Sequence, residues 1–184
     1  MLITTSDSEF SFIEEDFKFN YQQNITSYLD EFDSLFDQDL INIIVLWKIN
    51  RYAQFDSQTL KLINSIKKND KLLNLDKTRV ILTFVLKTKG VQIAMASTIL
   101  RFKNPKIYQI IDQRVYRLIY GKNLSNTNTN KTDINITKQI DVYLKYLIDL
   151  RLICNKQNIE FEFADRILYK ADKRVNKKIK LSNY

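Results

Sequence analysis

Glycine and proline are so scarce in this chain that they largely fix where it can turn sharply. The sequence has two glycines and one proline in 184 residues, and all three lie within residues 87–121. Glycine adopts backbone angles that other residues avoid, and proline pushes the residue before it out of the α region. Residues 87–121 therefore predict a helix end, a tight turn at 88–91, a helix, a turn at Asn104–Pro105 and a second helix opened by Asp112.

A chain with so few turn-forming residues favours helices over a β architecture. Apolar residues recur at three- and four-residue spacing along most of the sequence, which is the pattern of amphipathic helices. We expect an all-α fold, a compact bundle of about eight helices. The predicted helices cover residues 24–36, 40–52, 57–70, 77–86, 91–102, 113–120, 137–155 and 164–178. Asp56 and Asp76 are the predicted caps of the third and fourth of these helices, and Gly121 is the predicted end of the sixth.

The length suits one domain with a sizeable core, so we expect a single helical domain over residues 1–184. Residues 1–22 suit an extended arm or a short strand, because their phenylalanines alternate. The Asn- and Thr-rich residues 122–136 suit a flexible surface loop, and residues 179–184 a frayed basic tail. The segment 40–52 is the most apolar, and we expect its helix to be buried on most sides.

The chain has one cysteine, Cys154, and no histidine. An internal disulfide, a four-cysteine zinc site or iron–sulfur cluster, and a histidine-based triad are thereby excluded within one chain. We expect no metal and no cofactor. No apolar run reaches the length of a membrane span, and the first residues lack the basic start and apolar core of a signal peptide. The expectation is a cytoplasmic protein without a membrane partner.

Charge is distributed unevenly along the chain. Residues 1–47 carry ten acidic side chains and one basic side chain, a net charge of −9. Residues 48–184 carry 28 basic and 11 acidic side chains, a net charge of +17. A basic face is the electrostatic signature of a nucleic-acid-binding protein. The alternative is a solvated, lysine-rich surface that the acidic segment partly neutralises.

The segment 87–121 resembles the core motif of the helix-hairpin-helix DNA glycosylases. Those enzymes have a hairpin of the form L-P-G-V-G-x-x-x-A, an apolar helix, and a V-D-x-x-V-x-R segment. The matching residues here are Gly90, Val91 and Ala96 in the first part and Asp112, Val115 and Arg117 in the second. The interval of 22 residues between Gly90 and Asp112 also equals the family's usual interval. The match covers about the middle fifth of the chain.

The resemblance implies a helix-hairpin-helix motif and a DNA glycosylase activity with Asp112 as the catalytic aspartate. Ala94 stands where bifunctional members have their Schiff-base lysine, which implies a monofunctional enzyme without lyase activity. Many members carry an iron–sulfur cluster, for which this chain lacks the cysteines. The chain also departs from the motif, with Gln92 at the second hairpin glycine and Lys89 where proline or glycine is frequent.

Asp112 has two interpretations. A carboxylate close to the sugar stabilises the oxocarbenium-like transition state of N-glycosidic cleavage, and a helix start favours its negative charge. Aspartate is also among the best N-cap residues, so a cap alone explains its position. Arg114 lies two residues away, where it would either orient Asp112 or neutralise it.

The hairpin is the candidate DNA-binding element. Backbone N–H groups at a helix start bind phosphate, and phosphate contacts position a protein on DNA. The predicted DNA-binding residues are Lys87, Thr88, Lys89, Gly90, Val91, Gln92 and Arg114. The alternative is an ordinary turn between two core helices.

An enzyme that acts on a base in duplex DNA flips it into a pocket with aromatic or apolar walls. Trp47, Tyr52 and Phe55 are the candidate walls, and Tyr108 and Tyr116 are weaker candidates. Aromatic residues at helical spacing are more often part of a core. The sequence thus predicts a DNA-binding protein that acts as a monofunctional glycosylase. The alternative is a non-catalytic helical module of the same fold that binds nucleic acid or a protein.

Overall fold

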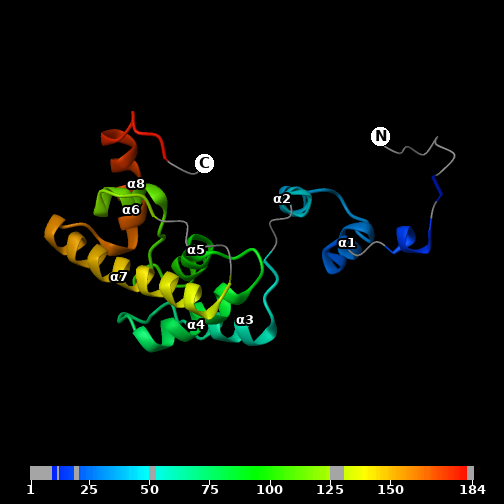
Figure 1. Cartoon of the computed structure of the whole chain (residues 1–184), viewed down its shortest axis with the longest axis horizontal. Helices are drawn as coiled ribbons and strands as arrows, with labels where there is room; N and C mark the ends of the chain where they lie inside the picture. The colour runs from blue at the N-terminus through cyan, green and yellow to red at the C-terminus, as the bar shows by residue number, and fades with distance from the viewer. Residues whose placement is uncertain (1–9, 12, 19–20, 50–52, 125–130, 182–184) are drawn as a thin grey trace. The chain divides into compact units, whose positions relative to one another are not determined.

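The computed structural model describes residues 10–11, 13–18, 21–49, 53–124 and 131–181. Within these ranges every regular element is a helix, with eight α-helices and two short 3-10 helices (Figure 1). The predicted all-α class is therefore confirmed. Contacts divide the chain into two compact units, Met1–Tyr52 and Ala53–Tyr184. The prediction of a single domain over residues 1–184 is left open by this division.

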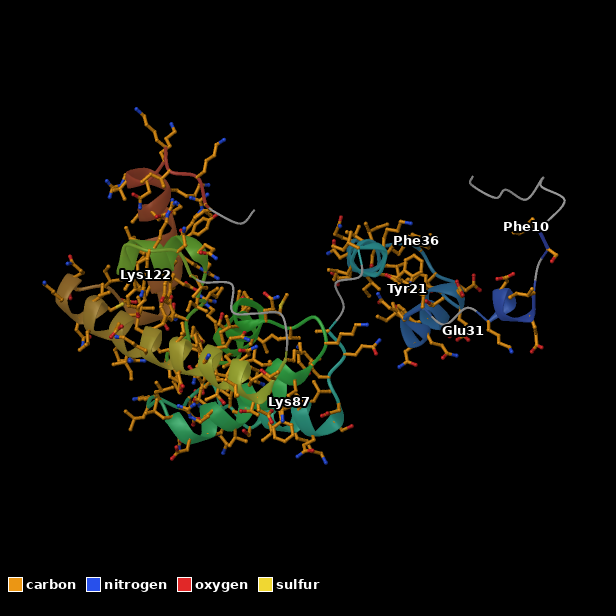
Figure 2. The ribbon with its side chains drawn as sticks, viewed as in Figure 1. Phe10, Tyr21, Glu31, Phe36, Lys87 and Lys122 are labelled. Atoms are coloured by element: carbon orange, nitrogen blue, oxygen red, sulfur yellow. The ribbon has the colours of Figure 1, made fainter. Side chains whose placement is uncertain are left out.

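The first unit contains η1 (Glu14–Phe17), α1 (Gln23–Asp30) and α2 (Gln38–Lys48). Tyr21, labelled in Figure 2, joins the two α-helices, because its hydroxyl donates to the backbone oxygen of Trp47 at 2.9 Å. The two rings meet edge to face at 5.3 Å. The Trp47 indole N–H also donates to the Thr26 hydroxyl at 3.0 Å. Trp47 thus connects the end of α2 to the start of α1.

Two predictions for the first unit are wrong. The helix predicted over residues 24–36 ends at Asp30, before the apolar residues that motivated its second half. The helix predicted over 40–52 was expected to be buried on most sides, but Leu40 is the one buried residue of α2. Val45 is 50% exposed and Ile49 is 55% exposed. Among the described residues of the first unit, the helices beside α2 are η1 and α1, which are short and cover little of its surface.

The second unit contains the remaining helices. They are α3 (Ser57–Asn64), α4 (Leu75–Lys87), α5 (Ile93–Lys103), α6 (Gln113–Tyr120), α7 (Asp133–Gln157), η2 (Phe161–Phe163) and α8 (Ala164–Val175). The long helix α7 packs against α4 and α5, and α6 packs against α8 (Figure 1). One hydrophobic core joins these helices, with Leu82 of α4, Leu100 of α5 and Leu147 of α7 at most 1% exposed.

Capping side chains set several helix starts. Asp56 opens α3 as predicted, because its carboxylate accepts from the Thr59 backbone N–H at 2.6 Å. Asn74, and not the predicted Asp76, opens α4 by accepting from the Lys77 backbone N–H at 2.9 Å. Asp76 lies in the first turn instead, where its charge complements the helix dipole.

The loop predicted over residues 122–136 is shorter than expected. Thr132 caps α7, which begins at Asp133, four residues before the predicted start. Residues 125–130, the centre of the predicted loop, lie outside the described residues. At the other end, α8 stops at Val175 and not near residue 178. The predicted arm over residues 1–22 and the tail over 179–184 fall partly outside the described residues as well.

A buried ion pair fixes α6 to α8. The Arg117 guanidinium donates two hydrogen bonds to the Asp172 carboxylate, each 2.7 Å long. Its third bond goes to the backbone oxygen of Ile179 at 3.0 Å. The start of the predicted basic tail is therefore attached to the core of the unit and does not fray at this residue.

Candidate functional site

Asp112 is the N-cap of α6, as the sequence predicts. Its Oδ1 accepts a hydrogen bond from the Val115 backbone N–H at 2.8 Å. The side chain is half-buried, and within the described part of the chain it forms no ion pair. The carboxylate is thus held by the backbone N–H groups of the first turn of α6.

Arg114 does not pair with Asp112, although this was one of the predicted arrangements. Its Nη1 lies 3.3 Å from Oδ2 of Asp172 instead. The Arg114 side chain remains 28% exposed, and its guanidinium lies 5.7 Å from the centre of the Tyr169 ring. Asp112 is therefore not neutralised by direct contact with a cation.

Burial raises the pKa of Asp112 above its ordinary value, and the nearby Asp165 carboxylate adds to the rise. The backbone N–H groups of Val115 and Arg114 and the charge of Arg114 oppose this shift. The half-buried carboxylate is therefore less screened by solvent than a fully exposed one, and its negative charge acts more strongly on positive charge that develops beside it.

Two open hollows adjoin Asp112. The larger has a volume of about 590 Å³, and the smaller about 370 Å³. The larger is lined by Asp112, Gln113, Arg114, Tyr169, Lys177, Ile179, Lys180 and Leu181. The smaller is lined by Ile110, Asp112, Asp165, Arg166, Tyr169, Lys170 and Lys173. Asp112 and Tyr169 belong to both, and most of the other charged lining residues are basic.

Asp165 is a carboxylate near Asp112 that sequence reasoning did not find. It is 4% exposed, and its Oδ2 lies 3.5 Å from Nε of Arg101 and 3.4 Å from the backbone nitrogen of Ile110. Its Oδ1 accepts from the Arg166 backbone N–H at 2.7 Å. Asp165 is therefore held rigidly at the start of α8, and it forms part of the wall of the smaller hollow.

Tyr169, Lys177 and Lys180 were also missed. Asp165, Tyr169 and Lys173 are spaced four residues apart, so they share one face of α8. The sequence offers that stripe as a signal. The packing of α8 on α6, which brings this face of α8 to Asp112, could not be predicted from that spacing.

The predicted hairpin is a tight turn between α4 and α5. The Val91 backbone N–H donates to the Thr88 oxygen at 3.2 Å. Gly90 has a φ of +80°, a conformation that favours glycine. No heavy atom lies within 4 Å of the place where a Cβ would stand, so the backbone angle alone calls for glycine here.

Lys131 fastens this turn, a role that sequence reasoning did not predict. Its ammonium donates to the backbone oxygens of Leu86, Thr88 and Val91, the last at 3.1 Å. Burial lowers the pKa of Lys131. Predicted Lys87, labelled in Figure 2, lies 3.2 Å from Oδ1 of Asp133, in a pair that is exposed on both sides. Exposed pairs of this kind are weak, so Lys87 remains available for another anion.

The start of α5 has no side-chain cap. Gln92 is the N-cap residue, but its side chain makes no capping hydrogen bond. Lys89, Gly90 and Gln92 are exposed, and Thr88 is half-buried. Four backbone N–H groups at a helix start have no partner within the helix. Binding of phosphate at this end of α5 stays a prediction.

A hydrogen bond connects helix α5 to the segment that precedes Asp112. The Ile111 backbone N–H donates to the hydroxyl of Ser97 in α5 at 3.2 Å. Ser97 lies four residues after the start of α5, a rise of about 6 Å along the helix axis. The segment that carries Asp112 is thus attached close to the end of α5 that follows the hairpin.

The predicted base-pocket residues are scattered over the chain. Trp47 belongs to the first unit, where it packs on Tyr21, and Phe55 belongs to the second, partly buried against the core. Tyr52 lies outside the described residues. That pocket stays a prediction. Tyr108 is a core residue, 3% exposed, whose hydroxyl shares a hydrogen bond with Thr78. Tyr116 is half-buried, with its ring 4.5 Å from that of Tyr120.

Comparisons with models of protein families, with curated protein sequences and with solved structures find no match to this chain. Across the described residues, no helix is both long and apolar enough to cross a membrane. The same residues contain no group of three or more His, Cys, Asp and Glu side chains arranged to hold a metal ion.

Proposed function

We propose that this chain binds DNA and hydrolyses the N-glycosidic bond of a damaged or modified base, without lyase activity. Asp112 is the proposed catalytic carboxylate. The observation that carries the proposal is the setting of this residue. Its carboxylate is half-buried, free of ion pairs within the described chain, and open to a hollow of about 590 Å³. A residue that served as a helix cap alone would need no such opening.

The chemistry follows from that setting. As the bond between the sugar C1′ and the base nitrogen breaks, the base leaves with the electron pair and positive charge develops on the sugar. An ionised carboxylate beside the sugar stabilises this charge, most strongly where little water competes. Water then bonds to C1′ and loses a proton, and the leaving base gains one. The Asp112 carboxylate borders the larger hollow, so it is placed to orient that water.

The α4–turn–α5 segment supports the DNA-binding part of the proposal as a helix-hairpin-helix motif. Its turn has the required glycine conformation at Gly90, and the donors at the start of α5 are not capped by Gln92. Phosphate at this position would gain hydrogen bonds and a favourable helix dipole. The second unit carries most of the positive charge of the chain, with 26 basic and 11 acidic side chains in residues 53–184.

The test is a panel of labelled duplexes that each carry one damaged or modified base. Abasic sites are revealed by strand scission in hot alkali. We expect abasic product from the wild type and a loss of about 100-fold or more in the Asp112→Asn variant. Asp56→Asn is the matched control, because Asp56 caps α3 in the same geometry but lies away from both hollows. It should retain full activity.

Two outcomes would overturn the catalytic proposal. One is the absence of abasic product across the panel, and the other is product that persists unchanged in Asp112→Asn. Binding of DNA that Asp112→Asn leaves unaltered, without any product, would identify the non-catalytic nucleic-acid-binding module. No DNA binding at low salt would rule out both.

A further inference from the structure

We propose that the larger hollow binds one unpaired nucleotide of a DNA strand, with its phosphate on Arg114, Lys177 and Lys180 and its base on Tyr169. This inference rests on the DNA-binding part of the proposed function and not on catalysis by Asp112. The hollow, at about 590 Å³, lies within the range of about 300–1,000 Å³ that is typical of ligand sites.

The charges around Asp172 leave the hollow with an excess of positive charge. Asp172 is fully buried and is matched by the two 2.7 Å bonds from Arg117. Arg114 therefore adds a second cation to a carboxylate that is already neutralised. It uses one donor on Asp172, at 3.3 Å, and a guanidinium has five. Its remaining donors suit the oxygens of a phosphate, which arginine binds in a planar, two-pronged manner.

The lysines come from a segment that is attached to the core. The Arg117 guanidinium donates to the Ile179 backbone oxygen at 3.0 Å, and the Ile179 backbone N–H donates to the oxygen of Asn176 at 2.9 Å. The Asn176 amide donates in turn to Asp172 at 2.7 Å. Lys177 and Lys180 flank these fixed points and are exposed. Their charges are thereby held beside the hollow, although their long side chains stay adaptable.

Tyr169 supplies an aromatic face. It is 39% exposed and borders both hollows. The Arg114 guanidinium and the Lys173 ammonium each lie 5.7 Å from its ring centre. Bases of single strands stack on aromatic side chains in basic grooves, with little regard to sequence. A base within an intact duplex is already stacked and does not present its face. The ligand chemistry that fits is therefore an unpaired nucleotide with its phosphate.

Two sources supply such a nucleotide, a single strand and a base extruded from a duplex. Fluorescence anisotropy with the full chain separates them, with a labelled twelve-nucleotide single strand, the matched duplex, and a duplex with one unpaired base. Inorganic phosphate serves as a competitor. A single-strand source predicts that the first probe binds tightest, and an extruded base predicts that the third binds tighter than the matched duplex.

The decisive variant is the double substitution Lys177→Gln/Lys180→Gln. Its control is Lys138→Gln/Lys156→Gln, which removes the same charge from exposed positions of α7. The site variant should weaken single-strand binding about tenfold at 0.1 M salt, and flatten the salt dependence of log K by about 0.7 per lost phosphate contact. The control should bind as the wild type does, within about twofold. Equal losses in the two double variants would overturn the site.

Tyr169 is tested separately. Tyr169→Phe keeps the ring and should retain binding, whereas Tyr169→Leu should lose it. Equal affinities of these two variants would overturn the stacking role.

The abasic-site assay keeps the two proposals distinct. Binding that depends on Lys177 and Lys180 but yields no abasic product would support this nucleotide site and overturn catalysis. Abasic product whose yield does not depend on these lysines would support catalysis and overturn the nucleotide site.

Discussion

Ser97 accepts a hydrogen bond at 3.2 Å from the backbone N–H of Ile111, and both residues are completely buried. The Ser97 hydroxyl donates in turn to the Ala94 oxygen at 2.8 Å. This pair of bonds connects the first turns of α5 with the segment that ends in Asp112. The small Ser97 side chain also permits that close approach, since a larger one would fill the space that the Ile111 backbone occupies.

Replacement of Ser97 by alanine should destabilise the protein. The Ile111 N–H would lose its partner in the core, and an unsatisfied buried donor costs about 1–3 kcal/mol. We expect the free energy of unfolding, measured with urea, to fall by about 1–2 kcal/mol. Thr98→Ala is the control, because the Thr98 hydroxyl donates to the same Ala94 oxygen but is exposed. A loss in Ser97→Ala no larger than in this control would show that the connection is unimportant.

Asp112→Asn should leave the protein as stable at pH 7 as the wild type, or more stable. Asparagine caps a helix about as well as aspartate. Burial raises the pKa of Asp112, so its charged form is disfavoured in the folded state. The folded state then holds the proton more tightly, and stability falls as the pH rises from the ordinary aspartate value through the raised one. Asparagine does not ionise, so the variant does not lose this stability as the pH rises.

The comparison is made by urea unfolding at several values between about pH 4 and pH 7. The advantage of Asp112→Asn should shrink as the pH falls. Asp56→Asn should behave in the opposite way, because the Thr59 backbone N–H lowers the pKa of Asp56. A large destabilisation by Asp112→Asn at pH 7 would contradict this prediction, because it would mean that the Asp112 charge stabilises the folded state.

Asp172→Asn should be among the most destabilising single changes in the chain. It would leave the Arg117 guanidinium buried without a counter-charge, a situation that costs about 3–5 kcal/mol. Hydrogen bonds from Arg117 lower the pKa of Asp172. Its contribution is therefore complete above the ordinary aspartate value and is lost as the pH falls through the lowered one. Asp141→Asn, in an exposed pair with Arg79, should cost less than about 1 kcal/mol.

Thermal and urea unfolding of the two variants measure this difference. A shift for Asp172→Asn as small as that for Asp141→Asn would contradict the assignment of Arg117–Asp172 as the buried attachment of α8.

The parts that sequence reasoning predicted correctly depend on neighbours in the chain. Asp56 and Asp112 were predicted as caps, and both accept the N–H three residues ahead. Gly121 was predicted to end α6, where it has a φ of +65°. Each of these features is decided by a few adjacent residues, so the pattern in the sequence suffices.

The parts that were missed depend on residues distant in the chain. The partner of Arg114 is 58 residues away at Asp172, and that pairing decides that Asp112 is left without a cation. Tyr169 reaches the site because α8 packs on α6. The exposure of α2 likewise depends on which other elements pack against it, and the hydrophobicity of its own residues does not predict those elements.

Lys131 provides the last prediction, because its ammonium gathers three backbone oxygens around the turn that contains Gly90. Lys131→Met would keep the apolar stem and remove these donors. We expect the Val91 amide, bonded to the Thr88 oxygen, to exchange its hydrogen faster, while the free energy of unfolding falls by about 1 kcal/mol. Hydrogen exchange followed by NMR measures the first effect, with amides in the middle of α4 as the internal reference.

If the turn contacts DNA phosphate, the affinity of Lys131→Met for DNA should also fall further than that of Lys138→Met, which removes an exposed charge on α7. Unchanged exchange at Val91, together with equal affinities of the two variants, would mean that the turn holds its shape without Lys131.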